Sequence, residues 1–529
     1  MNKTYQIWLL ILSVCLITVS ANAQSFRVQC PTSTITHPDP KNTGINNSEP
    51  AYTGPTTLAL NSSGFMAPTA HVNGAIKCQQ ISGGDGYSTM GDGTQTYMFS
   101  FGPLSGLADI ANGLPGTEPP SVFNTVAPPL QPGDPATTDP TLTTFSYNGA
   151  VGLTPDLDAI ATSTCTAPCL DGHVDPRPIL DVGVMNGNIP APLMAIDEDD
   201  EYFLTLTNVG MIMRPDLFEQ HTVHFHGYPN ASSFYDGVPD ASVAINIGAS
   251  FTYYYLAPDA GTYFWHCHIT PPEHLQMGMV GQMYVRPRQN RVTGDLYTAL
   301  QAQQNDLRTA CNSNIDILCS NPLPLVKTGA TGAATIAQGG KGGYAYNDGD
   351  GSTYYDVEYP IQIHGFDPNF HFVGMTFNPE EFTDMKDKYF LLNGRSYPDT
   401  VTPGPLQTMS TDGKTHFSQP LPSIINMTSG QKALLRISDL DVTEYQTLAS
   451  LGIPMKVVGY NAKLLRDQAG NNLYYSTNSI TLAGGESLDV ILDSTGVPTG
   501  IYYLYTPNLD HLSNDAENFG GLMTEIHIN

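Results

Sequence analysis

The sequence predicts an all-β protein in which two β-sandwich domains follow an irregular N-terminal extension. The 529 residues include 50 Gly and 41 Pro but only 13% charged residues, a composition typical of many short strands joined by turns. Alternating residues, as in Tyr202–Leu206, indicate half-buried strands, and no long stretch has the apolar spacing of a helix. The segment after about residue 355 repeats phrases of the segment before it, which predicts two copies of one sandwich.

Residues 1–23 have the pattern of a secretory signal peptide. A positive charge at Lys3 precedes the apolar run Ile7–Val19, and Ala21-Asn22-Ala23 stands before Gln24. This pattern is typical of a cleaved signal and not of a stable membrane span. We therefore expect an exported protein, periplasmic or extracellular.

Cysteine usage is consistent with an oxidising compartment. Of the 8 Cys, Cys15 leaves with the signal peptide and Cys267 lies in a histidine-rich motif, which leaves six. An even number in an exported chain predicts disulfides. The local candidates are Cys165–Cys169 and Cys311–Cys319, so that Cys30 remains to pair with Cys78.

Two stretches have the composition of loops. Residues 24–175 are rich in Pro, Gly, Thr and Ser, and we predict an extension that wraps the first domain. The linker or insertion 288–354 contains a stretch rich in Gly and Ala. These boundaries leave residues 176–287 as the first domain and residues 355–529 as the second.

The formal net charge of −28 excludes nucleic acid as an expected partner, because the phosphate backbone attracts basic surfaces. An acidic surface keeps an exported protein soluble. It also concentrates cations such as Mn²⁺, Fe²⁺ or Cu⁺ near the protein.

The densest group of metal-binding residue types lies in the phrase YFWHCHITPPEHLQMGM, residues 263–279. Its candidate ligands are His266, Cys267, His268, His274 and Met279. A thiolate, two imidazoles and a weak thioether form the trigonal site that suits copper. A structural zinc site also uses Cys and His, but zinc gains little from a thioether.

One imidazole of that site must come from elsewhere in the chain. Neighbours on a strand point to opposite faces, so His266 and His268 point away from Cys267. The upstream phrase HTVHFHG supplies three further histidines, His221, His224 and His226.

Together, HTVHFHG and HCHITPPEHLQMGM resemble the copper motifs of multicopper oxidases, H-x-x-H-x-H-G and H-C-H-x-x-x-H-x-x-x-G-M. The resemblance implies cupredoxin-like Greek-key sandwiches and copper as the cofactor. Carried over by position, it implies four ligands of a type 1 (blue) copper, which are His221, Cys267, His274 and Met279. It also implies half of a type 2/type 3 trinuclear cluster, from His224, His226, His266 and His268.

The chain departs from the family pattern at one place. Five residues, ITPPE, separate His268 from His274, where the family usually has three. This departure puts the shape of the ligand loop in question, and a longer loop here also resembles copper nitrite reductases.

Two flanking phrases extend the resemblance. The stretch VMNGNIPAPLMAIDEDDEYFLTLTN is similar to the opening of an oxidase's first cupredoxin domain. The phrase FYDGVP, residues 234–239, is similar to the turn that places an aspartate beside the trinuclear cluster, which makes Asp236 the candidate catalytic proton relay. The alternative is a turn aspartate that bonds to its own loop.

The second domain carries the phrases YFLLNGRSYPDT and KALLRISDL, which resemble the copper-free second domain of multicopper oxidases. Aligning HTVHFHGY with IPMKVVGY and GTYFWHCH with GIYYLYTP replaces each copper ligand in these phrases by a residue that cannot serve. The replacements are Ile453, Lys456, Val458, Tyr505, Thr506, Pro507 and, opposite Met279, Phe519. We expect this domain to be structural, or an interface, and to bind no copper.

Three functions are compatible with these residues. The first, favoured by the family resemblance, is an oxidoreductase similar to multicopper oxidases. In it, Cys267 passes electrons from a donor (a phenol, a metal ion or a redox protein) to copper at a subunit interface, where O₂ is reduced. The second is an enzyme similar to nitrite reductases with one catalytic copper. The third is an exported type 1 copper protein that transfers electrons or binds copper without catalysis of its own.

The histidine count bears on assembly. In the family, a complete trinuclear cluster takes eight histidines from four H-x-H pairs, and this chain supplies two such pairs. We therefore expect a homo-oligomer or a hetero-complex to complete the cluster, because a two-fold interface places one patch opposite its own copy.

Overall fold

The structure is a computed structural model of the chain. It describes residues 28–40, 56–62, 64–68, 72–106, 109–110, 112–123, 173–174, 187–211, 214, 217–227, 232–257, 259–292, 294–303, 322–327, 329, 342–374, 381–409 and 415–529. The predicted signal peptide and the pairs Cys165–Cys169 and Cys311–Cys319 lie outside these residues. Within them, no helix is long and apolar enough to cross a membrane.

The molecule is all-β, as the sequence predicts, and its first sandwich consists of two four-stranded sheets. One sheet has the order β10-β8-β4-β5, with bounds Ser250–Leu256, Glu201–Gly210, Ile76–Thr89 and Gln95–Pro103. The other has the order β7-β12-β11-β9, with bounds Met194–Asp197, Val280–Arg286, Gly261–His266 and His224–Phe225. Aromatic side chains such as Trp265, Phe101 and Tyr255 fill the core between the sheets.

The first sandwich begins much earlier in the chain than predicted. Strands β4 and β5 lie inside the range 24–175, which we predicted to be an extension with strand-like patches such as Gln95–Phe101, and both strands belong to a sheet of the first sandwich. Gly, Ser, Gln and Asp residues conceal strand β4 in the sequence, because they replace the usual apolar alternation. These polar side chains are nevertheless buried, and Gln80 donates to the Thr207 hydroxyl at 3.1 Å.

A disulfide connects this strand to the N-terminal segment. Cys30 and Cys78 are bonded, as the sequence predicts, and both are buried against Ile76 and Phe123. Strand β1 (Val28–Gln29), which pairs with β6 (His173–Val174), lies just before Cys30. The bond therefore ties this part of the chain to β4.

The second sandwich combines a nine-stranded and a five-stranded sheet. The larger sheet has the order β23-β22-β26-β20-β15-β16-β28-β29, and β24 pairs with β22. Its bounds in that order, with β24 last, are Lys463–Leu464, Met455–Tyr460, Ser487–Asp493, Lys432–Asp439, Val357–Phe366, Tyr389–Leu392, Ser513–Asn514, Glu517–Asn518 and Tyr475–Thr477. The smaller sheet, β19-β30-β27-β21-β25, has the bounds Ile425–Met427, Met523–Ile528, Gly500–Tyr505, Gln446–Leu451 and Ser479–Leu482.

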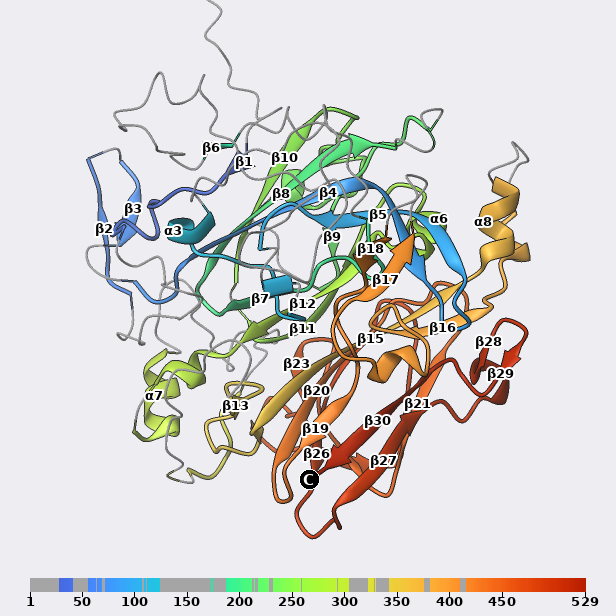
Figure 1. Cartoon of the computed structure of the whole chain (residues 1–529). Helices are drawn as coiled ribbons and strands as arrows, with labels where there is room; N and C mark the ends of the chain where they lie inside the picture. Colours follow the sequence, from blue (N-terminus) through green and yellow to red (C-terminus); the bar gives the residue numbers. More distant parts are fainter. Residues whose placement is uncertain are drawn as a thin grey trace, which may run out of the picture.

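Short elements connect and flank the two sandwiches (Figure 1). The remaining strands are β2 (Leu58–Leu60), β3 (Met66–Pro68), β13 (Gly343–Tyr344), β14 (Tyr354–Tyr355), β17 (Leu406–Met409) and β18 (Thr415–Ser418). Within the described residues, the α-helices are α3 (Pro120–Phe123), α6 (Pro271–Gln276), α7 (Leu296–Gln303) and α8 (Pro368–Gly374). The 3-10 helices are η1 (Ser233–Tyr235), η2 (Arg288–Arg291), η3 (Phe382–Asp384), η4 (Asp399–Val401) and η5 (Leu509–His511).

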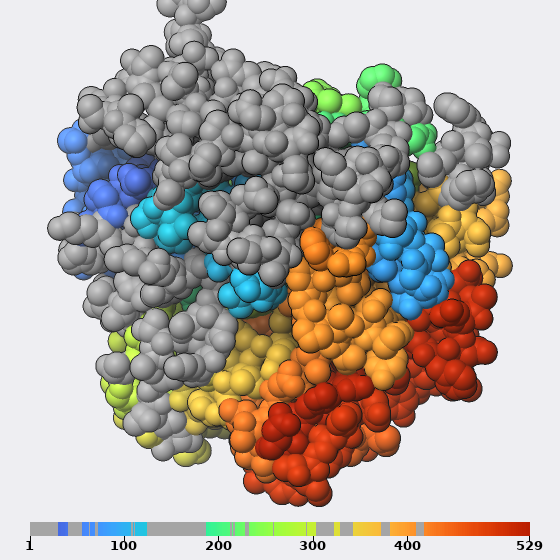
Figure 2. Space-filling model, viewed as in Figure 1, coloured from blue at the N-terminus to red at the C-terminus, as the bar shows by residue number. Residues whose placement is uncertain are grey.

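The turn between β4 and β5 packs directly on the second sandwich. Figure 2 shows this turn in blue beside orange residues of β17 and its surroundings. The Thr89 amide donates to the side chain of Gln419 at 2.8 Å, and the Gly91 amide donates to the Ser396 hydroxyl at 3.0 Å. The N-terminal strands therefore contribute contacts between the two sandwiches.

Buried charges also cross the interface between the sandwiches. Arg286, at the end of β12, pairs with Glu358 of β15, whose other oxygen lies 3.0 Å from Nε of Arg436 in β20. Both guanidinium groups lie over the ring of Tyr284. We call Arg286, Glu358 and Arg436 the interdomain charge cluster.

Candidate metal centre

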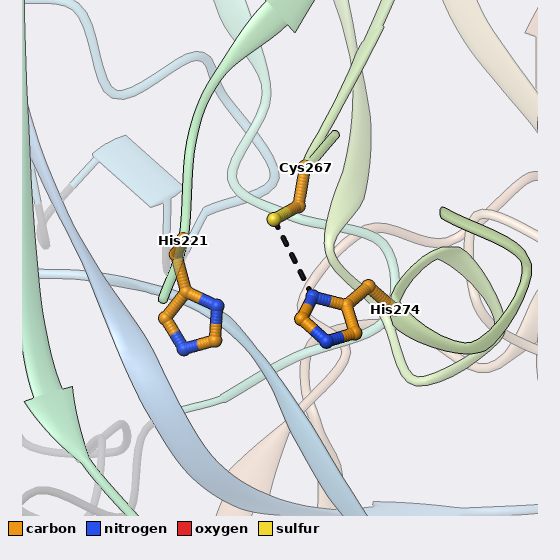
Figure 3. A group of neighbouring side chains, drawn as sticks. All are labelled: His221, Cys267 and His274. Atoms are coloured by element: carbon orange, nitrogen blue, oxygen red, sulfur yellow. Dashed lines mark hydrogen bonds between the residues drawn. The ribbon is translucent and has the colours of Figure 1, made fainter. Parts of the chain in front are cut away.

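Three side chains from separate elements converge in the core of the first sandwich (Figure 3). His221 forms a bridge with Ile245, Cys267 follows β11, and His274 lies on α6. The candidate ligand atoms of the three residues all lie within 4.8 Å of one another, and Sγ of Cys267 is 3.4 Å from Nδ1 of His274. We call this set the cysteine group.

Met279 is joined to the cysteine group through the backbone. The Cys267 amide donates to the Met279 carbonyl, and the Met279 amide donates to the His274 carbonyl, both at 2.9 Å. The Met279 side chain is fully buried in the same core as Cys267. Backbone pairing thus fixes Met279 beside the two residues that the sequence groups with it.

Helix α6 explains the long segment between His268 and His274. The helix begins at Pro271, and a proline is favourable in the first turn because its missing amide has no partner there. The ITPPE stretch therefore folds into a turn of helix that carries His274 back toward Cys267.

Burial sets the protonation states of the cysteine group. It lowers the pKa of His274 to about 3 and, together with nearby His274, lowers the pKa of His221 well below its usual value. Burial also raises the pKa of the Cys267 thiol to about 11. The imidazoles are therefore neutral, which is the form that binds metals, whereas the thiolate requires a nearby cation.

The side chains of the cysteine group suit a bound metal ion. Both ring nitrogens of His221 are buried without a hydrogen-bond partner. Such unpartnered groups are costly in a protein interior unless something satisfies them. Two imidazoles, a thiol and a thioether form the donor set of a soft or borderline metal such as copper.

Four more histidines gather on the other side of β11, and we call them the histidine group. His224, on β9, is paired in register with His266 on β11. Candidate ligand atoms of His224, His226 and His266 lie within 4.8 Å of one another. The ring of His268 is 5.1 Å from that of His224 and 5.4 Å from that of His266, measured between centroids.

Three of these rings are held in the same way. Nδ1 of His224 lies 2.7 Å from the Asp236 carbonyl, and Nδ1 of His266 lies 2.6 Å from the Cys267 carbonyl. His226 makes a backbone hydrogen bond with Gly485. An Nδ1 that donates a proton leaves Nε2 with a lone pair, which fixes the tautomer of each ring.

The histidine group also fits a cation. Nε2 of His226 and Nε2 of His266 are 2.9 Å apart, so two lone pairs face each other. Burial lowers the pKa of His226 to about 4 and that of His266 well below its usual value. Because both rings are neutral, a bound cation would satisfy the lone pairs better than a shared proton.

Asp236 lies beside the histidine group. Its carbonyl makes the short contact with His224, whereas the carboxylate oxygen Oδ2 lies 3.6 Å from Nδ1 of the same ring. The Asp236 side chain is 29% exposed. The carboxylate therefore connects the edge of the group to solvent.

Sequence reasoning missed three residues that enclose the cysteine group. A Cβ placed on Gly83 of β4 would lie 2.6 Å from Cδ2 of His221. On β5, Phe99 contacts the ring of His274 and Phe101 contacts that of His221, at centroid distances of 5.4 and 6.4 Å. A glycine inside a strand often marks a close approach, and this signal could have identified Gly83.

Sequence reasoning also missed Glu219, which lies two residues before His221. Its carboxylate is 3.8 Å from Nε2 of His274 and is 35% exposed. Burial raises the pKa of this carboxyl. Glu219 thus lies at Nε2 of His274, whereas Nδ1 of the same ring faces Cys267.

The comparison with protein families concerns part of the first sandwich. Residues 173–290 match the family model described as multicopper oxidase. Laccase abr2 of Aspergillus fumigatus is 34% identical over 109 residues, which cover 20% of this chain and 17% of that protein. The multicopper oxidase MmcO of Mycobacterium tuberculosis is 30% identical over 131 residues, which cover 23% of this chain and 24% of that protein.

A copper-containing nitrite reductase of Rhizobium meliloti is 33% identical over 114 residues, which cover 21% of this chain and 27% of that protein. The chain thus spans 17% to 27% of the length of these three relatives. Among solved structures, the chain is similar to the blue copper oxidase from Nitrosomonas europaea, with a TM-score of 0.46 and 17% identity over 85% of each chain.

Proposed function

We propose that this chain, which belongs to the multicopper oxidase family through residues 173–290, is an exported copper oxidoreductase. It takes electrons from a donor at the cysteine group and delivers them to O₂ at the histidine group. One observation carries the proposal. Cys267 belongs to the cysteine group, whereas its neighbours His266 and His268 belong to the histidine group. On each side of Cys267, one peptide bond therefore joins the two groups.

In this proposal, His221, Cys267, His274 and Met279 hold a type 1 copper. His224, His226, His266 and His268 hold copper of the type 2/type 3 kind. Bound copper supplies one-electron chemistry by alternating between Cu(I) and Cu(II). The chain supplies neutral imidazoles at His274 and His226, and backbone carbonyls fix the tautomers of His224 and His266.

The surroundings of the cysteine group suit electron transfer. Cys267, His221 and His274 are all buried, and Phe99 and Phe101 pack against the two imidazoles. This packing excludes water and leaves the rings little room to move, which limits the rearrangement that accompanies a change of charge. The partly exposed Glu219 marks the edge of His274 at which a phenol, a metal ion or a redox protein would donate electrons.

Reduction of O₂ to water consumes protons as well as electrons. Asp236 is the proposed relay, because its carboxylate reaches both solvent and the ring of His224. A carboxylate in this place can accept a proton from water and hold it at the edge of the histidine group.

The proposal includes assembly, because the chain supplies four of the eight histidines that the resemblance requires for a trinuclear cluster. His224, His226 and His268 are only partly buried, so a second copy or a partner chain could approach them. An isologous dimer would place two histidine groups opposite each other. Export is part of the same proposal and is supported by the Cys30–Cys78 disulfide.

A second candidate function is an exported type 1 copper protein that carries electrons without catalysis. The histidine count favours it, because one subunit alone offers an incomplete cluster. Copper stoichiometry and oligomeric state, measured on one sample, separate the two functions. A strictly monomeric protein that binds one copper and reduces neither O₂ nor nitrite would be the carrier.

The decisive variants are His226→Ala and His268→Ala. Each should abolish O₂ consumption while the visible absorption of the type 1 site stays, because neither residue belongs to the cysteine group. His527→Ala is the matched control, since this histidine pairs with Glu525 on the second sandwich. Normal turnover in both of the first two variants would overturn the oxidase proposal.

A further inference from the structure

The second sandwich contributes a loop to the histidine group of the first sandwich. Residues 483–486, with the sequence AGGE, connect β25 to β26 and reach the ring of His226. We propose that this loop, and Gly485 in particular, is a positioning element for the histidine group. It fixes which nitrogen of His226 faces the other rings. This inference rests on the proposed metal-binding function of that group.

The contact identifies the nitrogen involved. A Cβ built on Gly485 would lie 2.9 Å from Nδ1 of His226, so Nδ1 is the atom that faces the loop. The Gly485 amide is already bound to the Asp439 carbonyl, so the backbone group of Gly485 that interacts with His226 is its carbonyl, and the imidazole is the donor. With its proton on Nδ1, His226 presents the lone pair of Nε2 toward Nε2 of His266, 2.9 Å away.

The loop is rigid enough to position a ring. The Gly485 amide donates to the Asp439 carbonyl at 2.9 Å, and the Asp439 amide donates to the Glu486 carbonyl at 3.0 Å. The Ala483 amide donates to a carboxylate oxygen of Glu486 at 2.8 Å, and the hydroxyl of Tyr460 donates to the other oxygen. Backbone and side chain therefore hold the loop from both sides.

Only glycine suits the position of Gly485. Its φ of +89° is in the left-handed region that side chains rarely adopt, and a Cβ would crowd Nδ1 of His226. Gly484 is equally constrained, because a Cβ there would lie 2.0 Å from the Asp441 carbonyl. The glycine pair allows the backbone to approach the imidazole closely.

The second sandwich supports the histidine group through a series of contacts. A relay of contacts runs from the loop to Nδ1 of His226, from Nε2 of His226 to His266, and from Nδ1 of His266 to the Cys267 carbonyl. The second sandwich thus supports the metal centre through its backbone. Partners of this kind usually change metal affinity by about 10- to 100-fold when they are removed.

The test compares Gly485→Ala with Gly430→Ala in the full-length protein. Gly430 also has a φ of +89° and lies in the second sandwich, but a Cβ there would meet nothing within 4 Å. The two variants therefore place alanine at the same φ, and only Gly485→Ala crowds His226. Cu²⁺ is titrated into each metal-free protein, and the ¹⁵N shifts of the His226 ring report its tautomer before metal is added.

We expect Gly485→Ala to bind copper at the histidine group about 10- to 100-fold more weakly, with an altered electron paramagnetic resonance signal of the non-blue copper. The blue absorption of the cysteine group should persist and shows that the variant is folded. Gly430→Ala should behave like the unmodified protein. Equal copper affinity and an equal His226 tautomer in the two variants would overturn the inference.

His226→Ala separates this inference from the proposed function. If it leaves the copper content of the histidine group unchanged, the proposed metal site itself is wrong. If it removes that copper while Gly485→Ala has no effect, only the role of the loop is wrong. If Gly485→Ala loses its blue band, Tyr460→Phe tests the role of the loop instead. This variant removes one hydroxyl that supports the loop and should also weaken copper binding at the histidine group.

Discussion

Replacing Gly83 by alanine tests how tightly the cysteine group is enclosed. The new Cβ would lie 2.6 Å from Cδ2 of His221, whereas ordinary contact begins at 3.4 Å, so the imidazole has to move by about 0.8 Å. Phe101 packs against the same ring, which limits the directions open to it. Crowding of this kind destabilises a core by about 1–3 kcal/mol. A catalytic group displaced by about 1 Å can lose about 10²-fold in rate.

The assay for Gly83→Ala combines visible spectroscopy of the copper-loaded protein, turnover and urea unfolding. We expect a shifted or weakened blue band together with the loss of stability. The matched control is Gly84→Ala, whose Cβ would lie 2.5 Å from Cγ2 of Val209, a comparable crowding without a metal-binding residue. If both variants lose the same stability and keep the same blue band, Gly83 does not hold His221 in place.

Three other perturbations have defined outcomes. Cys267→Ser should abolish the visible absorption, whereas Met279→Gln should keep it and lower the reduction potential in a redox titration; colour in the serine variant would contradict the type 1 assignment. Burial acts to raise the pKa of Glu358, but Arg286 and Arg436 outweigh it and lower this pKa to about 2. The pairing therefore adds about 3 kcal/mol to the free energy of unfolding above pH ~4.5, and this contribution is lost as the pH falls toward 2. In urea unfolding, the difference in free energy between the unmodified protein and Glu358→Gln should therefore become smaller in acid. Removing copper with a chelator should lower the free energy of unfolding, and added copper should restore it. The loss depends on the free copper concentration and is about 2.7 kcal/mol at 100 times the dissociation constant.

The sequence was sufficient to group the candidate metal-binding residues. Side chains alternate along a strand, so His266 and Cys267 had to face different ways, and the structure places them in different groups. Their roles as copper ligands stay predictions. Local spacing carries this information, because each motif lies within a few residues of one strand.

The parts that sequence reasoning missed depend on contacts between distant segments. Strand β4 is concealed because its polar residues are satisfied by neighbouring strands and not by water, as with Gln80 and Thr207. Gly83 and Gly485 have no local signal that names their partners, His221 and His226. A glycine shows that something approaches closely, but only the fold shows what it is.

The interdomain charge cluster has a consequence for how the protein unfolds. Arg286 belongs to the first sandwich, whereas Glu358 and Arg436 belong to the second, and all three are buried. If the second sandwich opened alone, Arg286 would lose its carboxylate partner Glu358, and a buried charge left without its partner typically costs about 3–5 kcal/mol. The two sandwiches should therefore melt as one cooperative unit, with a single calorimetric transition. A fragment that begins near residue 355 would expose this charged face and lose the partner that Arg286 provides.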